Sequence, residues 1–229
     1  MKNKAVFSTE LAYLLGIIIL ALGTAFMERA DFGVSMVVAP AYILHIHFHK
    51  TYSFFTFGMA EYVLQFFILI ILCIVMRKAK ISYLFSFVTA VFYGFTLDFC
   101  IKILSSLPRE TMFDRSWNYV AGILLCALGV ALLFHTYIAP EAYELFVKEL
   151  SASFNKRIDR VKTVYDTCSC LIGVLLSFIF FGFGHFEGVK LGTILCALIN
   201  GWIIGRTSAL LEHFFEFKDS LSLRPLFDR

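Results

Sequence analysis

The sequence has few charged residues and few prolines for its length. Only 16% of its 229 residues are Asp, Glu, Lys or Arg, and only 4 are proline. Soluble domains carry about 25% charged residues, so a large water-soluble domain is excluded. A net charge of +3 with no basic face also argues against nucleic acid as a partner. In place of charge the sequence has 59% hydrophobic residues, 27 of its residues being phenylalanine, which is typical of helices that lie in lipid.

Motifs for catalysis and metal binding are missing as well. There is no His-Glu-x-x-His, no nucleophile elbow and no phosphate loop. We therefore expect no catalytic residues, no cofactor and no enzyme, and an intramembrane enzyme ranks last. The 6 cysteines form no Cys-x-x-Cys pair and are predicted to be packing residues. His45, His47 and His49 would share one side only in a strand, and this stretch resembles a helix end, so no metal site is predicted.

Six apolar runs are long enough to cross a bilayer, which takes about 20 residues. They cover residues 11–27, 52–76, 81–101, 116–140, 163–186 and 191–211. The first run is interpreted as a span and not as a cleaved signal peptide, because charged residues follow it without a small-x-small cleavage site. With the N-terminus in the cytoplasm, 14 of the 20 Lys and Arg fall on the cytoplasmic side. The positive-inside rule then predicts a multi-pass protein with both termini cytoplasmic.

Two connecting segments are too apolar to be ordinary loops. Residues 30–50 contain Gly33 and Pro40, so they cannot form one smooth helix. Residues 139–154 open with Pro140 and Glu141, which favour a helix start, and continue with apolar residues at helical spacing. We predict a broken or re-entrant half-helix in each segment. An ordinary amphipathic helix at the membrane surface is the alternative.

The two halves of the sequence resemble each other weakly. Residues 21–25 (ALGTA) match residues 127–131 (ALGVA), Glu61 matches Asp166, and Gly94 matches Gly201, at offsets of 106, 105 and 107. Three spans in each copy force the second copy into the opposite orientation, the architecture of many secondary transporters. The predicted fold is an all-α membrane protein of six transmembrane helices in two inverted three-helix repeats. The repeats would cover residues 1–107 and 108–214, before a cytoplasmic tail at 215–229.

Several motifs are similar to those of a known family. These are the pattern around residues 21–35 (ALG, then RADFGVS), TFGMAEY at 56–62, YGFTLDF at 93–99, RVKTVYD at 160–166 and the segment 188–206. In this order and spacing they resemble the YitT/YczE-like family of bacterial integral membrane proteins. The resemblance covers about residues 10–210. It implies a multi-span protein of the bacterial cytoplasmic (inner) membrane and implies little about a substrate.

Ionisable residues inside the predicted spans are the candidates for a pathway. Each costs about 2.5–3.5 kcal/mol at the centre of a span and needs a partner or a function. The predicted solute or ion pathway consists of Asp31, Ser35, Glu61, Asp98, Glu141, Asp166, Asn200 and Arg206. The predicted gate consists of Arg29, Gly33, Pro40 and Pro140. The alternatives are acids that stabilise helix N-termini and, for Arg29 with Asp31, a local ion pair at the headgroups.

Small residues mark predicted packing faces. They are Gly23 and Gly129 in the matching motifs, and the ladder Ala197, Gly201, Gly205 and Ala209. Such residues let helices approach closely, within the bundle or in a homodimer.

The function predicted from these features is a small-solute transporter or permease in the lipid bilayer, with an unidentified solute and a coupling ion. The alternative is a non-transporting scaffold, regulator or substrate-capture subunit. It would use the glycine ladder or the basic stretch 156–162.

Overall fold

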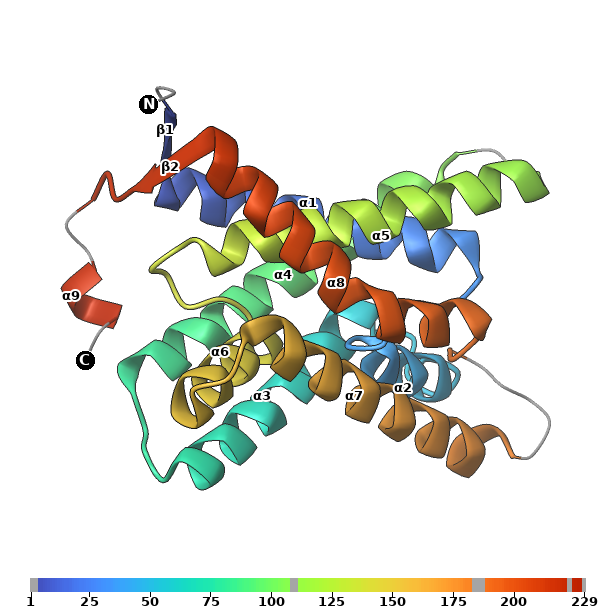
Figure 1. Ribbon diagram of the computed structural model, residues 1–229. Coiled ribbons are helices and arrows are strands. Elements are labelled where there is room, and N and C mark those ends of the chain that lie inside the picture. Colours follow the sequence, from blue (N-terminus) through green and yellow to red (C-terminus); the bar gives the residue numbers. More distant parts are fainter. Residues whose placement is uncertain (1–3, 108–110, 183–187, 222–223, 228–229) are drawn as a thin grey trace.

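The computed structural model describes residues 4–107, 111–182, 188–221 and 224–227. In this part of the chain, six helices are long and apolar enough to cross a membrane. They are α1 (Thr9–Ala30), α3 (Phe57–Met76), α4 (Ile81–Ser105), α5 (Met112–Phe134), α7 (Ile158–Phe181) and α8 (Leu191–Phe214) (Figure 1). A helix satisfies its backbone hydrogen bonds internally, as a chain in lipid must. The predicted all-α membrane class with six spans is confirmed.

Most of the predicted span boundaries differ from the structure by several residues; the second span, for example, was predicted to begin at 52, but α3 begins at Phe57. The fourth span was predicted to reach residue 140, but α5 ends at Phe134. The fifth was predicted to begin at 163, but α7 begins at Ile158. Lys162, predicted in a basic loop, is therefore inside a helix and only 1% exposed. It tolerates burial because it forms ion pairs there. The predicted end of the fifth span, 183–186, lies outside the described residues.

Two short helices occupy the segments predicted to be broken, α2 (Ala39–His49) and α6 (Ala142–Phe154). Each has its buried residues at its start and its exposed residues at its end. Pro40 lies in the first turn of α2, where proline is tolerated. Before α2 the chain turns at Gly33, whose φ of 112° is open to glycine. Both short helices thus begin inside the bundle and run outward to its surface.

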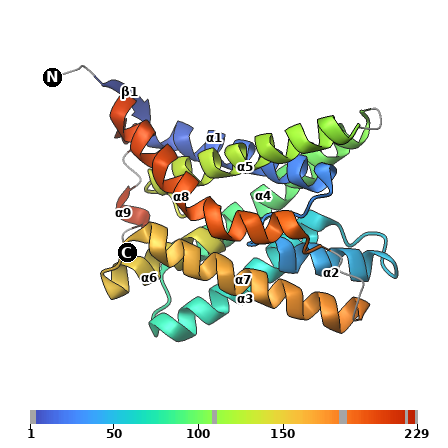
Figure 2. The same ribbon diagram turned by 45° about the vertical axis from the view of Figure 1, so that its right-hand side comes forward.

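Helices α1 and α5 form the closest pair in the core, and they cross in opposite directions (Figures 1 and 2). Gly16 lies against Gly129, and Gly23 lies against Gly122. A Cβ atom on Gly23 would come 2.7 Å from the backbone nitrogen of Cys126. Close approach of this kind is how small residues hold membrane helices together.

The outer faces of the other long helices carry exposed apolar side chains. On α3 these include Phe66, Phe67 and Ile70, and on α7 they include Leu175 and Ile179. A soluble protein rarely exposes so much apolar surface, whereas lipid solvates it. Contact with a lipid bilayer follows from these faces and from the six spans.

Strands β1 (Ala5–Ser8) and β2 (Phe215–Lys218) pair in parallel, and α9 (Arg224–Phe227) contacts α4. We call the end of the bundle that holds β1 and β2 the strand end. Helix α1 begins there, α8 ends there, and the turn between α6 and α7 also lies there (Figure 1). The other end, where α1 stops and α8 starts, is the ion-pair end.

Candidate functional site

The centre of the bundle contains a cluster of buried ionisable side chains. Glu61, Glu141, Glu144 and Asp166 are each at most 3% exposed, and they come from α3, the start of α6 and α7. Among the buried residues that the structure describes, Lys162 is the only Lys or Arg. One ammonium cannot neutralise four carboxylates, and unpaired charge in a low-dielectric interior is very costly. The cluster therefore needs added positive charge, either as bound protons or as a bound cation.

Lys162 connects two of the helices in this cluster. Its Nζ lies 3.1 Å from Glu144 Oε1 on α6 and 3.1 Å from Asp166 Oδ1 on α7. Asp166 lies one helical turn after Lys162, a spacing that places both side chains on the same helix face. The buried ion pairs tie the start of α6 to α7.

Gln65 of α3 organises the other side of the cluster. Its side-chain amide donates to Glu141 Oε2 at 3.0 Å, and its Oε1 accepts from the backbone N–H of Ala142 at 2.9 Å. It thus satisfies a backbone donor at the start of α6, where a helix has no partner of its own. Tyr143 donates its hydroxyl to Glu61 Oε2 at 3.0 Å.

The turn that leads into α6 is held by hydroxyl groups of α4. Ser86 donates to the carbonyl of Pro140 at 2.6 Å, and Thr89 donates to the carbonyl of Ala139 at 2.9 Å. A carbonyl freed by a proline break in a membrane helix needs such donors. These bonds fix the start of α6 deep in the protein, with Glu141 and Glu144 facing the other acids.

A small cavity of about 20 Å³ lies within the cluster. Glu141, Glu144 and Lys162 line it, together with Asn200 of α8 and Ser35, which precedes α2. This volume holds about one water molecule. One oxygen each of Glu61, Glu141 and Glu144 is buried without a hydrogen-bond partner. Buried oxygens of this kind are rare in native proteins and indicate a ligand, a proton or water.

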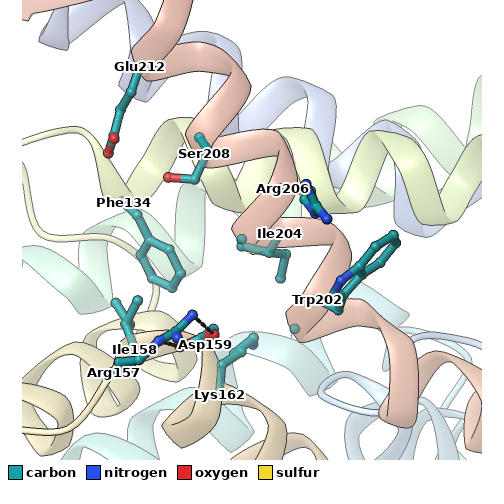
Figure 3. A pocket seen from close by; sticks show the side chains of 13 residues that line it. Phe134, Arg157, Ile158, Asp159, Lys162, Trp202, Ile204, Arg206, Ser208 and Glu212 are labelled. Atoms are coloured by element: carbon teal, nitrogen blue, oxygen red, sulfur yellow. Dashed lines mark hydrogen bonds and ion pairs between the residues drawn. The ribbon is translucent and has the colours of Figure 1, made fainter.

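A much larger hollow of about 450 Å³ opens at the strand end, between α7 and α8. Figure 3 shows Arg157, Asp159 and Lys162 facing α8 across it. Arg157 donates to both oxygens of Asp159, the closer at 2.8 Å. Lys162 lines both this hollow and the small cavity, and their linings share no other residue that the structure describes. The hollow thus reaches the central cluster at Lys162.

At the ion-pair end, Asp31 joins three helices. It ends α1 with φ at 56°, and its carboxylate accepts from Arg115 of α5 at 3.1 Å. It also forms an ion pair with Lys190, the N-cap of α8. A second bond from Lys190 reaches the Asp31 carbonyl at 3.1 Å. The predicted pathway residue Asp31 therefore lies at this end, away from the central cluster.

The predicted pathway residues fall into two groups. Glu61, Glu141, Asp166, Asn200 and Ser35 meet in or beside the cavity. The others lie elsewhere, and they are Asp31, Asp98 and Arg206.

Asp98 accepts from the backbone N–H of Gly58 at 2.9 Å and so stabilises the start of α3. Arg206 lies over the Trp202 ring beside the hollow.

The residues of the predicted gate have structural contacts. Arg29 donates to the carbonyl of Leu107, and the carbonyl of Pro140 accepts from Ser86. Gly33 packs against Thr193 at the start of α8. Pro40 begins α2 and borders an apolar hollow between α3 and α7.

The small-residue ladder of α8 changes its environment along the helix. Ala197 is buried, and Gly201 lies against Thr163 of α7. Gly205 and Ala209 are exposed and line the large hollow. The ladder thus packs α8 against α7 at Gly201, whereas one and two turns later it borders the large hollow.

The histidines of the predicted helix end make local contacts. His45 and His49 both contact the carbonyl of Phe55 through Nδ1, and His47 stacks on Phe180. Over the described residues, no group of three or more His, Cys, Asp or Glu side chains is placed to hold a metal ion.

A family model matches residues 7–209, nearly the whole bundle. The chain belongs to the DUF6198 family, a family of unknown function. No curated protein and no solved structure matches the chain. This DUF6198 protein is thus a multi-pass membrane protein, and its similarity to YitT/YczE-like proteins stays a prediction.

Sequence reasoning missed several residues of the cluster, namely Gln65, Tyr143, Glu144 and Lys162. Lys162 and Asp166 are four residues apart, the spacing of an ion pair on one helix face. That spacing was the available signal for Lys162. Glu144 had none, because its burial depends on the path of the chain before α6.

Proposed function

We propose that this DUF6198 protein is a small-solute transporter whose binding site is the central cluster. The observation that carries the proposal is the burial of four carboxyl groups against one lysine at the start of α6. Ionisable groups inside a membrane protein are costly and usually mark a substrate or ion pathway. Transporter sites are commonly built where a broken helix starts near the middle of the membrane.

We further propose that the two halves are inverted repeats, in which α1 to α4 correspond to α5 to α8. Tyr13 and Tyr119 are 106 positions apart, and each bonds the fourth long or short helix of its own half. Tyr13 bonds Thr89 of α4 at 2.7 Å, and Tyr119 donates to the carbonyl of Gly192 of α8 at 2.6 Å. Helix packing follows the same correspondence, because α1 packs on α4 as α5 packs on α8, and α2 packs on α7 as α6 packs on α3.

The glycine contacts between α1 and α5 also support the repeat. Gly16 corresponds to Gly122 and Gly23 corresponds to Gly129, again at 106 positions. The contact of Gly16 with Gly129 therefore corresponds to the contact of Gly122 with Gly23. A pair of helices related by a twofold axis in the membrane plane makes contacts of this form.

In this proposal the described conformation is closed around the site. A cavity of about 20 Å³ holds no solute larger than about one water molecule. Transport then requires helices around the cluster to move, so that the cluster faces one side of the membrane and then the other. We propose that the strand end is cytoplasmic, as the distribution of Lys and Arg predicts.

The test is transport by the purified protein in proteoliposomes. Currents on a solid-supported membrane would be recorded for a panel of amino acids, sugars, carboxylates, amines and inorganic phosphate. We expect at least one class to give a current that Glu61→Gln and Asp166→Asn reduce by about tenfold or more, a loss of about 1.4 kcal/mol. Glu149→Gln is the matched control, because Glu149 pairs with Lys80 outside the cluster. A current indifferent to the loss of Glu61 and Asp166 would contradict the proposal, as would the absence of any current.

A further inference from the structure

We propose that the coupling ion is the proton, and that Lys162 is the gate between the large hollow and the central cavity. The gate opens when protonation of Asp166 removes one of the two carboxylates that hold the Lys162 ammonium. This inference rests on the proposed function, but its test measures access to the cavity and needs no transported solute.

Lys162 lies between two internal spaces. Among the described residues it alone lines both the hollow of about 450 Å³ and the cavity of about 20 Å³. Its side chain is 2% exposed and lies between the two spaces. A lysine side chain is a flexible stem with a compact charge, so it moves without a change in the helix that carries it.

A second carboxylate, outside the cluster, can accept the released ammonium. Asp159 lies three residues before Lys162 and Asp166 lies four after it, so all three share one face of α7. Asp159 lines the hollow, whereas Asp166 lies in the cluster. Lys162 can therefore exchange a buried carboxylate for an accessible one by rotation of its own side chain.

The cluster has more acids than cations. On the cavity side, Lys162 faces Glu141 and Glu144 at the start of α6, and Tyr165 and Asp166 of α7. Glu61 of α3 lies behind them, where it accepts from Tyr143. The carboxyl groups outnumber the ammonium, and no three of the described donors converge as metal ligands. Protons neutralise acids one at a time without such convergence, so they fit this arrangement better than a metal ion.

The remaining titratable neighbours do not compete for this role. Tyr93 of α4 and Cys126 of α5 also line the cavity, and a phenol and a thiol are ordinarily uncharged at neutral pH. Arg157, Arg206 and Glu212 line the hollow. Arg157 is paired with Asp159, and Glu212 contacts His135, so both are held away from the Lys162 ammonium.

Cys126 provides a native reporter inside the cavity, because it lines that space and is buried. One protein would keep Cys126 as its single cysteine. A second would carry Ala209→Cys as its single cysteine, in the wall of the open hollow. Both would be placed in nanodiscs and treated with a cationic methanethiosulfonate reagent. The ratio of the two rates removes the common effect of pH on thiol reactivity.

We expect the ratio to rise by about tenfold per pH unit as the pH falls from about 8 towards 6, if one proton opens the gate. Lys162→Met should give a high ratio at every pH, and Lys162→Arg should keep the pH dependence. If Lys162→Met does not fold, the Lys162→Met/Glu144→Gln double variant removes both charges and should also give a high ratio. A ratio that is flat with pH, or unchanged without Lys162, would overturn the proposal.

A second route to the cavity must be tested as well. An apolar hollow of about 210 Å³ between α3 and α7 borders the cavity at Val37 and Tyr143. Gly205→Leu adds a side chain in the large hollow, and Ser169→Phe adds one in the apolar hollow. We expect Gly205→Leu alone to slow the modification of Cys126. Slowing by Ser169→Phe alone would contradict entry past Lys162. Access that follows pH in a protein with no transport current would support the gate and contradict the transporter.

Discussion

Lys162 of α7 and Glu144 of α6 form an ion pair at 3.1 Å, with side chains that are only 2% and 4% exposed. Removing one partner of a buried pair leaves the other charge uncompensated. We predict that Lys162→Met lowers the free energy of unfolding by about 3–5 kcal/mol. The double variant Lys162→Met/Glu144→Gln should recover part of this loss, as measured by denaturant titration in one detergent.

Lys156→Met is the control for this pair, because Lys156 is exposed in the turn before α7. Surface substitutions usually change stability by less than about 0.5 kcal/mol. Equal stabilities of the single and the double variant would show that Lys162 and Glu144 are not coupled.

The contact between α1 and α5 predicts a contrast between two glycines. Gly23→Ala would place Cβ 2.7 Å from the backbone nitrogen of Cys126, so the helices must separate. We expect a loss of about 1–3 kcal/mol, the usual cost of overpacking. Gly205→Ala meets its nearest atom at 3.9 Å and should be neutral or stabilising by up to about 1 kcal/mol, because alanine favours helix. Thermal unfolding of both variants measures the contrast, and similar melting temperatures would argue against close packing at Gly23.

Tyr13 and Tyr119 give a quantitative test of the repeat. Tyr13→Phe and Tyr119→Phe each remove one hydrogen bond between a first and a fourth helix of a half. Each should cost about 0.5–1.5 kcal/mol, and the two losses should be similar and additive, because the sites are independent. Denaturant titration of both single variants and the double variant would measure this. A large loss for one tyrosine and none for the other would indicate that the two bonds are not equivalent.

At the ion-pair end, we predict that the stabilisation from the ion pairs of Asp31 depends on salt concentration. The Asp31 side chain is 60% exposed, so its pairs with Arg115 and Lys190 contribute at most about 1 kcal/mol. Asp31→Asn keeps a residue type that tolerates positive φ and removes only the charge. We expect a small loss of stability that disappears at high salt. The melting temperature of both proteins should be recorded over a salt series, and a difference that persists in high salt would point to packing and not to charge.

From the contacts of Asp219 we predict how the stability of β2 and the segment after it changes in acid. It accepts from Thr9 at 3.0 Å, and its hydrogen bond from Arg224 holds the pKa of the carboxyl below its ordinary value. Because the pKa of Asp219 is lowered in the folded state, its bonds to Thr9 and Arg224 hold this segment in place at pH values above the ordinary carboxyl pKa. This stabilisation is lost as the pH falls through the lowered pKa of Asp219. Hydrogen exchange of residues 215–221 should therefore accelerate only in strong acid. In the Asp219→Asn variant these amides should exchange faster at neutral pH. Exchange rates that change neither in strong acid nor in this variant would contradict the prediction.

The six spans could be predicted from the sequence because the membrane imposes a length and a composition on each. The break within residues 30–50 and the helix start near Pro140 were also predicted, because proline cannot lie in the interior of a regular helix. The position of Lys162 was not predictable from its charge, because a charged residue is usually exposed. Lys162 lies in a basic stretch, but its partners Asp166 and Glu144 make burial possible.

The candidate site was predicted in part for a related reason. Glu61 and Asp166 could be selected because they interrupt apolar runs. Asp98 also interrupts an apolar run, but it accepts from the backbone N–H of Gly58 at the start of α3. Composition alone does not distinguish an acid of the central cluster from an acid that stabilises a helix start. Gln65 is uncharged, and only its position opposite the start of α6 makes it part of the cluster.

The pairing of β1 with β2 limits which parts of the protein can move. The ladder from Ala5 with Phe215 to Ser8 with Lys218 fastens the beginning of α1 to the end of α8. Helix α5 packs along both α1 and α8, so these three helices are held together at the strand end. If the space between α7 and α8 widens, the movement must then be that of α7 and α6 away from these three helices. The moving part of the protein would then be α6 and α7, the two helices that carry Glu144, Lys162 and Asp166.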